Sequence, residues 1–179
     1  MAGRSAVIVP FRIPGDLEAI RIAGDRMAAR GVPPHVTILF PFLLVAALTP
    51  EVRSALAALA AQTPMFVARF DVVERRDESV WLLPADQQPF LDLTAGVADL
   101  WPDHPPYEGA HDHLIAHMTL VETWNMKTLD AARAAATASG PFGASAAELR
   151  VITEDEAGHW HTRWHLPLGP HGTAPTLDA

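Results

Sequence analysis

The stretch Pro34-His35-Val36-Thr37-Ile38-Leu39-Phe40 decides the fold, because a similar stretch returns 82 residues later (117 − 35 = 82) as Ala116-His117-Met118-Thr119-Leu120-Val121. Both copies read His, apolar, Thr, apolar, apolar. β-Branched and large apolar residues that lie among Pro and Gly favour short strands over helices. The two stretches therefore predict two equivalent strands.

Side chains two residues apart in a strand point to the same face of the sheet. His35 and Thr37 therefore share one face of the first strand, and His117 and Thr119 share one face of the second. The residues between and after them are apolar and supply the opposite face for a hydrophobic core. We expect the two polar pairs to meet across one cleft.

The elements around the two motifs repeat as well. Apolar periodicity, caps and turn residues predict helices at 16–30, 49–61, 88–101 and 128–139, and strands at 5–13, 35–42, 65–73, 79–83, 114–121, 142–153 and 161–168. Thr49 and Thr128 are the expected N-caps of the second and fourth helices. A second marker keeps almost the same offset, since Ser79–Pro84 aligns with Thr162–Pro167 at 83 residues.

This order predicts an α+β fold made of a duplicated bilobal unit within a single domain, 1–168. After the first strand, the lobes are expected at 14–84 and 86–168, each a small antiparallel sheet with helices on its outer face. A pseudo-two-fold would relate the lobes about a central groove. Residues 169–179, which are rich in Pro, Gly and Thr, are expected to form a disordered tail.

Composition excludes several classes of function. The chain of 179 residues has no cysteine, which excludes disulfides, thiol chemistry and thiolate metal sites. Its net charge of −8 argues against binding long nucleic acid, which needs a broad basic surface. No apolar run is long enough to cross a bilayer, and no signal peptide is recognisable. We therefore expect a cytoplasmic monomer that does not bind membranes.

Two imidazoles that face each other suit general acid–base catalysis near neutral pH. One can take a proton from a nucleophile while the other gives a proton to the leaving group. The two threonine hydroxyls can donate to the non-bridging oxygens of a phosphate. The set of His35, Thr37, His117 and Thr119 therefore points to attack on a phosphodiester without metal or other cofactor.

The two His-x-Thr-hydrophobic motifs resemble those of the 2H phosphoesterase superfamily. The segment 34–42 and the loop Pro105-Pro106-Tyr107-Glu108-Gly109-Ala110 are similar to its 2′-5′ RNA ligase-like branch. The resemblance extends from about Ser5 to Leu168. One departure is Ala116, which precedes the second motif where the family commonly has Pro.

This resemblance implies a bilobal duplicated α+β fold and metal-independent action on 2′,3′-cyclic phosphates or 2′,5′ linkages of nucleotides or RNA ends. By position, His35 and His117 would be the acid–base pair, and Thr37 and Thr119 would bind the phosphate. The expected partner is a small phosphorylated nucleotide or an RNA terminus.

Further side chains could contact the substrate. Tyr107 lies in the loop before the second motif, Arg12 lies near the end of the first predicted strand, and Trp164 and His165 lie on the last strand. Trp81 and Trp164 occupy matched positions in the repeat. These tryptophans are either core anchors or, for one of them, a surface on which a base stacks.

Two alternatives stay open at the level of sequence. The protein could bind nucleotides or RNA ends without catalysis, because a duplicated fold that lost its chemistry would keep the pattern. It could also be a metal-dependent hydrolase that uses His111, His113 and His117. That spacing suits one helix face, whereas a strand would separate the last two residues by about 13 Å.

Overall fold

The computed structural model describes residues 3–109 and 114–170. Within these residues, eight strands form one antiparallel sheet in the order β6-β3-β4-β5-β2-β1-β7-β8. The strands are β1 (Ser5–Pro10), β2 (His35–Leu39), β3 (Phe66–Arg75), β4 (Ser79–Pro84), β5 (Met118–Glu122), β6 (Phe142–Ala146), β7 (Glu148–Glu154) and β8 (Trp160–Pro167). The α-helices are α1 (Gly15–Gly24), α2 (Pro50–Gln62), α3 (Gln88–Leu100) and α4 (Met126–Ser139). The α+β class is as expected.

The expectation of two separate small sheets is wrong, because the two motif strands pair with each other. Val36 of β2 lies opposite Met118 of β5, and this contact joins the two halves into one sheet. Each half also draws strands from both predicted lobes. In the half β6-β3-β4-β5, β3 and β4 come from the predicted lobe 14–84, and β5 and β6 come from the predicted lobe 86–168. In the half β2-β1-β7-β8, β2 comes from the first lobe, β7 and β8 come from the second, and β1 precedes both.

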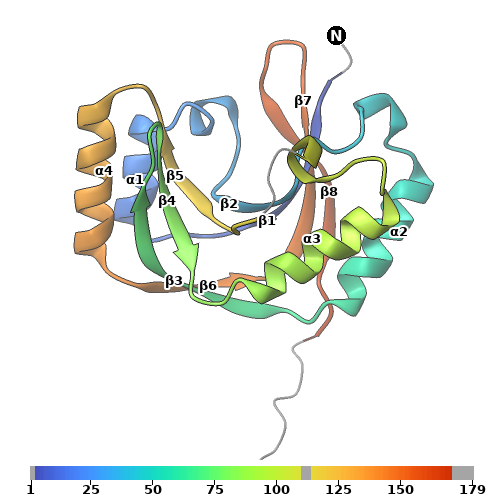
Figure 1. Cartoon of the computed structure of the whole chain (residues 1–179). Helices are drawn as coiled ribbons and strands as arrows, with labels where there is room; N and C mark the ends of the chain where they lie inside the picture. Colours follow the sequence, from blue (N-terminus) through green and yellow to red (C-terminus); the bar gives the residue numbers. More distant parts are fainter. Residues whose placement is uncertain (1–2, 110–113, 171–179) are drawn as a thin grey trace, which may run out of the picture.

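The segment 142–153, expected to be one strand, forms two strands that lie in different parts of the sheet, and the sheet curls as a result. Only Ala147 separates β6 from β7. β6 nevertheless pairs with β3 at one end of the sheet, whereas β7 pairs with β1 and β8 near the other end. The two ends of the sheet are therefore brought together at this residue (Figure 1).

The helices cover the two halves of the sheet separately. α1 and α4 pack on the half that contains β5, whereas α2 contacts β8 and α3 contacts β2 (Figure 1). The Thr49 hydroxyl caps α2 by accepting from the Val52 amide, as expected. α4 begins earlier than expected, because the cap is Asn125, whose Oδ1 accepts from the amides of Lys127 and Thr128. Thr128 lies inside the helix and is not its cap.

The first helix ends at Gly24, six residues before the expected end at Arg30. The Asp25 amide still donates to the Arg21 carbonyl, but the backbone of Asp25 is extended. The Asp25 carboxylate then accepts from the Ala28 amide and starts the short 3₁₀ helix η1 (Ala28–Arg30). A side chain that competes for backbone donors thus divides what the sequence pattern presented as one helix.

The hydrophobic core contains the apolar faces of both motif strands. Val36, Ile38, Met118 and Leu120 are buried, while the His and Thr side chains that alternate with them are half-buried. This alternation confirms the faces expected for the two strands. Among the described residues, no helix has both the length and the apolar character needed to cross a membrane.

The C-terminal segment is ordered for longer than expected. Gly169 donates its amide to the carbonyls of Ala60 and Thr63, at the end of α2. The predicted tail therefore does not begin at this residue. Residues 171–179 lie outside the described residues.

Candidate active site

The pairing of β2 with β5 brings the two motifs together with their residues crossed. In antiparallel pairing, the numbers of opposite residues have a constant sum, here 36 + 118 = 154. His35 is therefore level with Thr119, and Thr37 is level with His117. Residues directly opposite each other lie about 5 Å apart at Cβ, and diagonal neighbours about 7 Å apart. The register thus places the two histidines on one diagonal of a four-residue square and the two threonines on the other.

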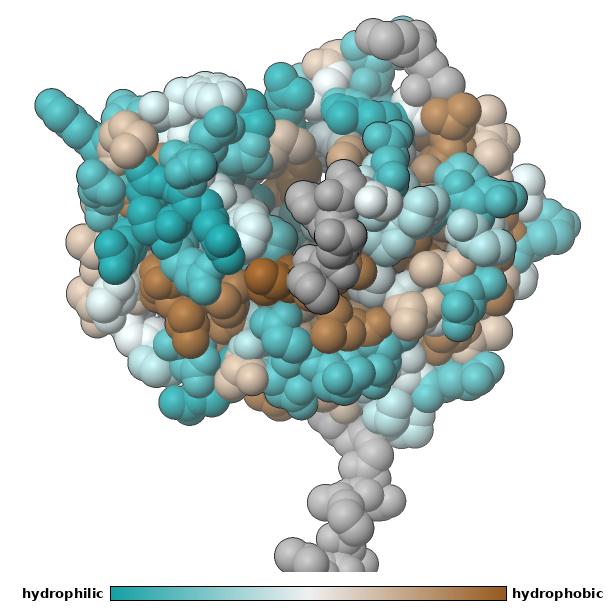
Figure 2. Space-filling view, viewed as in Figure 1, coloured by the Kyte–Doolittle hydropathy of each residue, from teal (hydrophilic) through white to brown (hydrophobic). Residues whose placement is uncertain are grey.

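All four side chains line one pocket. The pocket has a volume of about 410 Å³ and contains His35, Thr37, His117 and Thr119 in its wall. Figure 2 shows the molecule hollowed near the centre of this face, between the two halves of the sheet. The expectation that the two polar pairs meet across one cleft is therefore met by the geometry.

The ring of His35 is fixed by two hydrogen bonds. Its Nδ1 lies 2.8 Å from the Pro33 carbonyl oxygen, which can only accept, so we assign the ring proton to Nδ1. Its Nε2 lies 3.1 Å from Thr37 Oγ1 and accepts from that hydroxyl. The unprotonated nitrogen of His35 is thus paired with the second polar residue of the same motif.

The ring of His117 makes the same kind of Nδ1 hydrogen bond as His35, but an aromatic ring also stacks on its face. Its Nδ1 donates to the Ile115 carbonyl at 2.8 Å, which reproduces the bond that His35 makes two residues back. The indole of Trp81 stacks on the imidazole with ring centroids 3.7 Å apart and planes 14° apart. The Arg76 guanidinium covers Trp81 at 4.6 Å. The sequence offered Trp81 as a core anchor or a base-stacking residue, but it supports a motif histidine.

Both histidines are held in the neutral form in the free protein. Burial, with smaller contributions from Arg21 and His117, lowers the pKa of His35 to about 4, although the hydrogen bond with the Pro33 carbonyl raises it. Burial also lowers the pKa of His117, and Arg76 adds to this while the Ile115 carbonyl and Glu74 oppose it. Each ring therefore presents an unprotonated Nε2 at neutral pH, ready to accept a proton.

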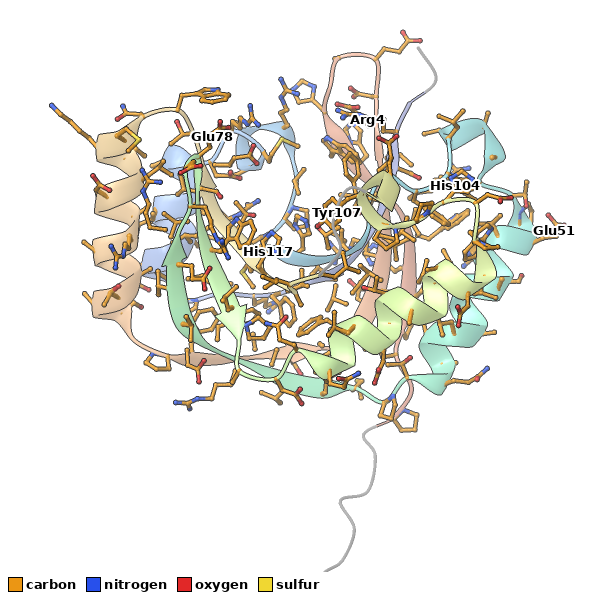
Figure 3. The ribbon with its side chains drawn as sticks, viewed as in Figure 1. Arg4, Glu51, Glu78, His104, Tyr107 and His117 are labelled. Carbon is orange, nitrogen blue, oxygen red and sulfur yellow. The ribbon has the colours of Figure 1, made fainter. Side chains whose placement is uncertain are left out.

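Tyr107 enters the pocket from the loop that precedes the second motif. It lies in the short helical turn η3 (Pro106–Gly109) with a positive φ of 53°, and its amide donates to the Phe40 carbonyl at 2.7 Å. Burial raises the pKa of its phenol, and a hydrogen bond with the Thr37 side chain opposes this. Figure 3 shows His117 and Tyr107 approaching the same central space. Tyr107 thus lines the same pocket as the four motif residues, and its contact with a substrate stays a prediction.

The other predicted contacts do not line this pocket. Arg12 is exposed beyond the end of β1. Trp164 packs against the hydrophobic core, and His165 pairs through Nδ1 with Glu148 Oε2 at 2.9 Å. Their strand, β8, is an edge strand separated from β2 by β1 and β7. The only part of β8 that reaches the pocket, among the described residues, is its first residue, Trp160.

Charged residues that the motifs did not indicate complete the pocket. Its wall includes four arginines and two carboxylates: Arg4, Arg21, Arg26, Arg30, Asp25 and Glu122. Arg26 pairs with Glu122, and the guanidinium of Arg4 lies over the rings of Phe40 and Trp160 at 5.7 and 5.8 Å. An available signal was the spacing of Arg21 and Asp25, which suits an ion pair across one helical turn.

A metal centre finds no support within the described residues. No group of three or more His, Cys, Asp or Glu side chains lies close enough there to hold an ion. His111 and His113, which the metal hypothesis requires, lie outside the described residues.

Comparisons with known proteins identify the family and agree with the fold. The model of the 2′-5′ RNA ligase superfamily matches residues 9–158. TT0787 of Thermus thermophilus has a similar structure, with a TM-score of 0.60, 16% identity, and coverage of 94% of this chain and 100% of that chain. LigT of E. coli in its apo form gives a TM-score of 0.57 at 15% identity, covering 93% of this chain and 98% of that chain.

LigT has also been solved in complex with 3′-AMP, and that structure gives a TM-score of 0.53 at 16% identity, with 94% of this chain and 99% of that chain covered. No curated protein matches the sequence. The likeness to the solved structures establishes the fold, and the residues matched by the family model include both motif stretches.

Proposed function

Because the chain belongs to the 2′-5′ RNA ligase superfamily, we propose that it is a metal-independent phosphoesterase. Its substrates are 2′,3′-cyclic phosphates or 2′,5′ linkages of nucleotides or RNA ends. The observation that carries this proposal is the register of β2 on β5, which brings two histidines and two threonines to one pocket wall. Two proton-transfer groups and two neutral donors match the needs of one phosphodiester.

Hydrolysis of a 2′,3′-cyclic phosphate would proceed by attack of water on phosphorus. One imidazole takes a proton from the water as the new P–O bond forms. The other gives a proton to the ribose oxygen as its bond to phosphorus breaks. The net change is the addition of one water, which leaves a phosphomonoester and a free ribose hydroxyl. The Thr37 hydroxyl turns from His35 Nε2 to the phosphate when the substrate binds, and Thr37 and Thr119 then donate to the non-bridging oxygens, on which negative charge grows.

The surroundings of the two rings assign the two roles in the hydrolytic direction. His35 is the base, because its pKa of about 4 keeps Nε2 unprotonated at neutral pH. His117 is the acid, because its pKa is lowered less than that of His35, and a bound phosphate favours its protonated form. In the reverse direction the two residues exchange roles.

The size and charge of the site favour a small substrate. The volume of about 410 Å³ lies within the range of small-molecule sites. The net charge of −8 disfavours long nucleic acid, whereas the pocket arginines can attract a single phosphorylated end. LigT, which shares the fold, has been solved with 3′-AMP and with ATP.

The test is a panel of 2′,3′-cyclic mononucleotides, 2′,5′-dinucleotides and RNA with a cyclic-phosphate end, assayed with chelator present. We expect turnover of at least one class, and loss of at least about 10³-fold in kcat for His35→Ala and for His117→Ala. His161→Ala is the control, because that histidine is exposed and pairs with Asp155 outside the pocket.

Three results would contradict the proposal. A folded protein with no turnover but tight nucleotide binding would be a binding protein. Activity that chelator abolishes and Zn²⁺ restores would indicate a metal hydrolase. Turnover that survives both alanine substitutions would place the chemistry elsewhere.

A further inference from the structure

A buried arginine lies beside the motif histidines and has no role in the mechanism above. α1 buries two residues, Leu17 and Arg21, which are one helical turn apart on its inner face. The Arg21 side chain is only 4% exposed and lines the same pocket as His35 and Thr119. Burying a guanidinium where an apolar side chain would pack costs free energy, unless its charge has a use.

The ion pair of Arg21 occupies only part of its guanidinium. Its Nη2 lies 3.2 Å from Asp25 Oδ2. Within the described residues, its Nε is buried and has no hydrogen-bond partner. A buried donor without an acceptor is uncommon in proteins and costs about 1–3 kcal/mol. The free N–H is therefore the feature of this residue that needs explanation.

Asp25 is held in place by several donors and does not rotate to satisfy that N–H. Its Oδ2 accepts from the Ala28 amide at 2.7 Å, and its Oδ1 accepts from the Glu122 amide at 3.0 Å. These bonds tie the end of α1 to the end of β5, the strand that carries Thr119. Asp25 therefore fixes the guanidinium of Arg21 relative to the motif.

A second unsatisfied donor lies in the same pocket. Trp160 is 6% exposed and its Nε1 is buried without a partner among the described residues. It and Arg21 Nε are the two buried side-chain atoms of the described chain in this condition, and both residues line the one pocket. Two unmatched donors in one cavity indicate a ligand rich in acceptor oxygens.

We propose that Arg21 is a phosphate ligand, whose Nε–H donates to a non-bridging oxygen of the phosphate held between the two motif histidines. This inference rests on the proposed function and adds to it a permanent positive charge, which the threonine hydroxyls cannot supply. As phosphorus becomes five-coordinate, the non-bridging oxygens gain negative charge and the bond to Arg21 strengthens. Arg21 thus serves the transition state more than the ground state.

The experiment measures binding of inorganic phosphate by calorimetry, and turnover of a 2′,3′-cyclic mononucleotide, in four variants. For Arg21→Gln we expect at least tenfold weaker phosphate binding and a loss of about 10²–10³ in kcat. Asp25→Asn keeps the guanidinium but removes the carboxylate that fixes it, so it should lower stability and weaken phosphate binding less than Arg21→Gln does. Arg53→Gln is the matched control, since Arg53 is exposed on α2 away from the pocket.

A second readout separates a phosphate ligand from a purely structural residue. Because the charge of Arg21 helps to lower the pKa of His35, Arg21→Gln should raise that pKa, as followed by NMR of the imidazole. Arg21→Lys keeps the charge and should leave that pKa low, yet it cannot reproduce the fixed Nε–H and should still lose kcat. The lysine variant also decides the question if the glutamine variant does not fold.

Wild-type phosphate affinity and kcat in folded Arg21→Gln or Arg21→Lys would overturn the inference. So would an equal loss of phosphate binding in Asp25→Asn and Arg21→Gln, because Arg21 would then act only through the fold. The proposed function fails separately, if phosphate binding by the wild-type protein is indifferent to His35→Ala and Thr119→Val.

Discussion

The two motif histidines make the same backbone hydrogen bond but have different surroundings. Each donates Nδ1–H to the carbonyl two residues earlier in the chain. Beyond that, His35 is paired with the Thr37 hydroxyl, whereas His117 lies under Trp81. The motif itself was readable from residue types at fixed spacing. The unequal surroundings were not, because Trp81 and Arg21 come from elements distant in sequence.

The lowered pKa of His35 makes the stability of the fold depend on pH. The unfolded chain takes up a proton at this residue near pH 6.5, whereas the folded protein resists protonation until about pH 4. The stabilising contribution is therefore complete above pH 6.5 and is lost as the pH falls toward 4. We expect a loss of about 2–3 kcal/mol in the free energy of unfolding across this window.

Urea denaturation at pH 7, 6, 5 and 4 measures this contribution. His35→Gln does not titrate, so its stability should fall less than that of the wild-type protein over the same window. If the free energy of unfolding fell equally with pH in both proteins, the pKa of His35 would be the same in the folded and the unfolded chain.

Trp81 should matter for catalysis through the orientation of His117. An aromatic stack of this kind contributes about 0.5–1.5 kcal/mol. Trp81→Leu should therefore lower kcat by about two- to tenfold with KM nearly unchanged, and Trp81→Phe should lose less. Steady-state kinetics measure these effects, and Trp124→Leu is the control because Trp124 is exposed. A change in KM alone would instead indicate that Trp81 contacts the substrate.

At the scale of elements, the caps show where sequence reasoning reaches its limit. Thr49 caps α2 as its position before Pro50 predicts. Asn125 and Thr128 both precede the apolar stripe of α4, and both residue types are good caps. In the structure Asn125 is the cap, because its side-chain oxygen accepts from two backbone amides. The expected end of α1 was wrong for a similar reason. Asp25 ends the helix by accepting from the amides of Ala28 and Glu122, and these partners are known only once η1 and β5 are in place.

This difference gives a paired test on α4. Asn125→Ala should lower the free energy of unfolding by about 1 kcal/mol, because two amides lose their acceptor. Thr128→Ala removes no cap and should change stability by less than about 0.5 kcal/mol. The reverse order in thermal or urea denaturation would show that the helix begins at Thr128.

For the whole molecule, the single curled sheet could not be predicted from the sequence. Local patterns identified nearly every strand, but they carry no information on which strands pair across long distances. The strand expected at 142–153 reads as one element, and its division at Ala147 between two ends of the sheet depends on partners 70 or more residues away. The internal duplication of the chain stays a prediction.

Closure of the molecule at its C-terminal end can be tested at Gly169. A Cβ at this position would overlap the Ala61 carbonyl oxygen at the end of α2. Gly169→Ala should therefore destabilise the protein by about 1–3 kcal/mol, as overpacking does. Gly15→Ala is the control, because nothing lies within 4 Å of a Cβ there. Equal urea midpoints for both variants would show that the segment after β8 is not packed on α2.

In the proposed mechanism both motif histidines share one phosphate, and imidazole ¹⁵N NMR during a titration with inorganic phosphate can follow both rings at once. We expect both rings to begin as the Nδ1–H tautomer, and the Nε2 resonances of His35 and His117 then to shift together with one dissociation constant. Movement of only one ring, or of the two rings with different constants, would contradict it.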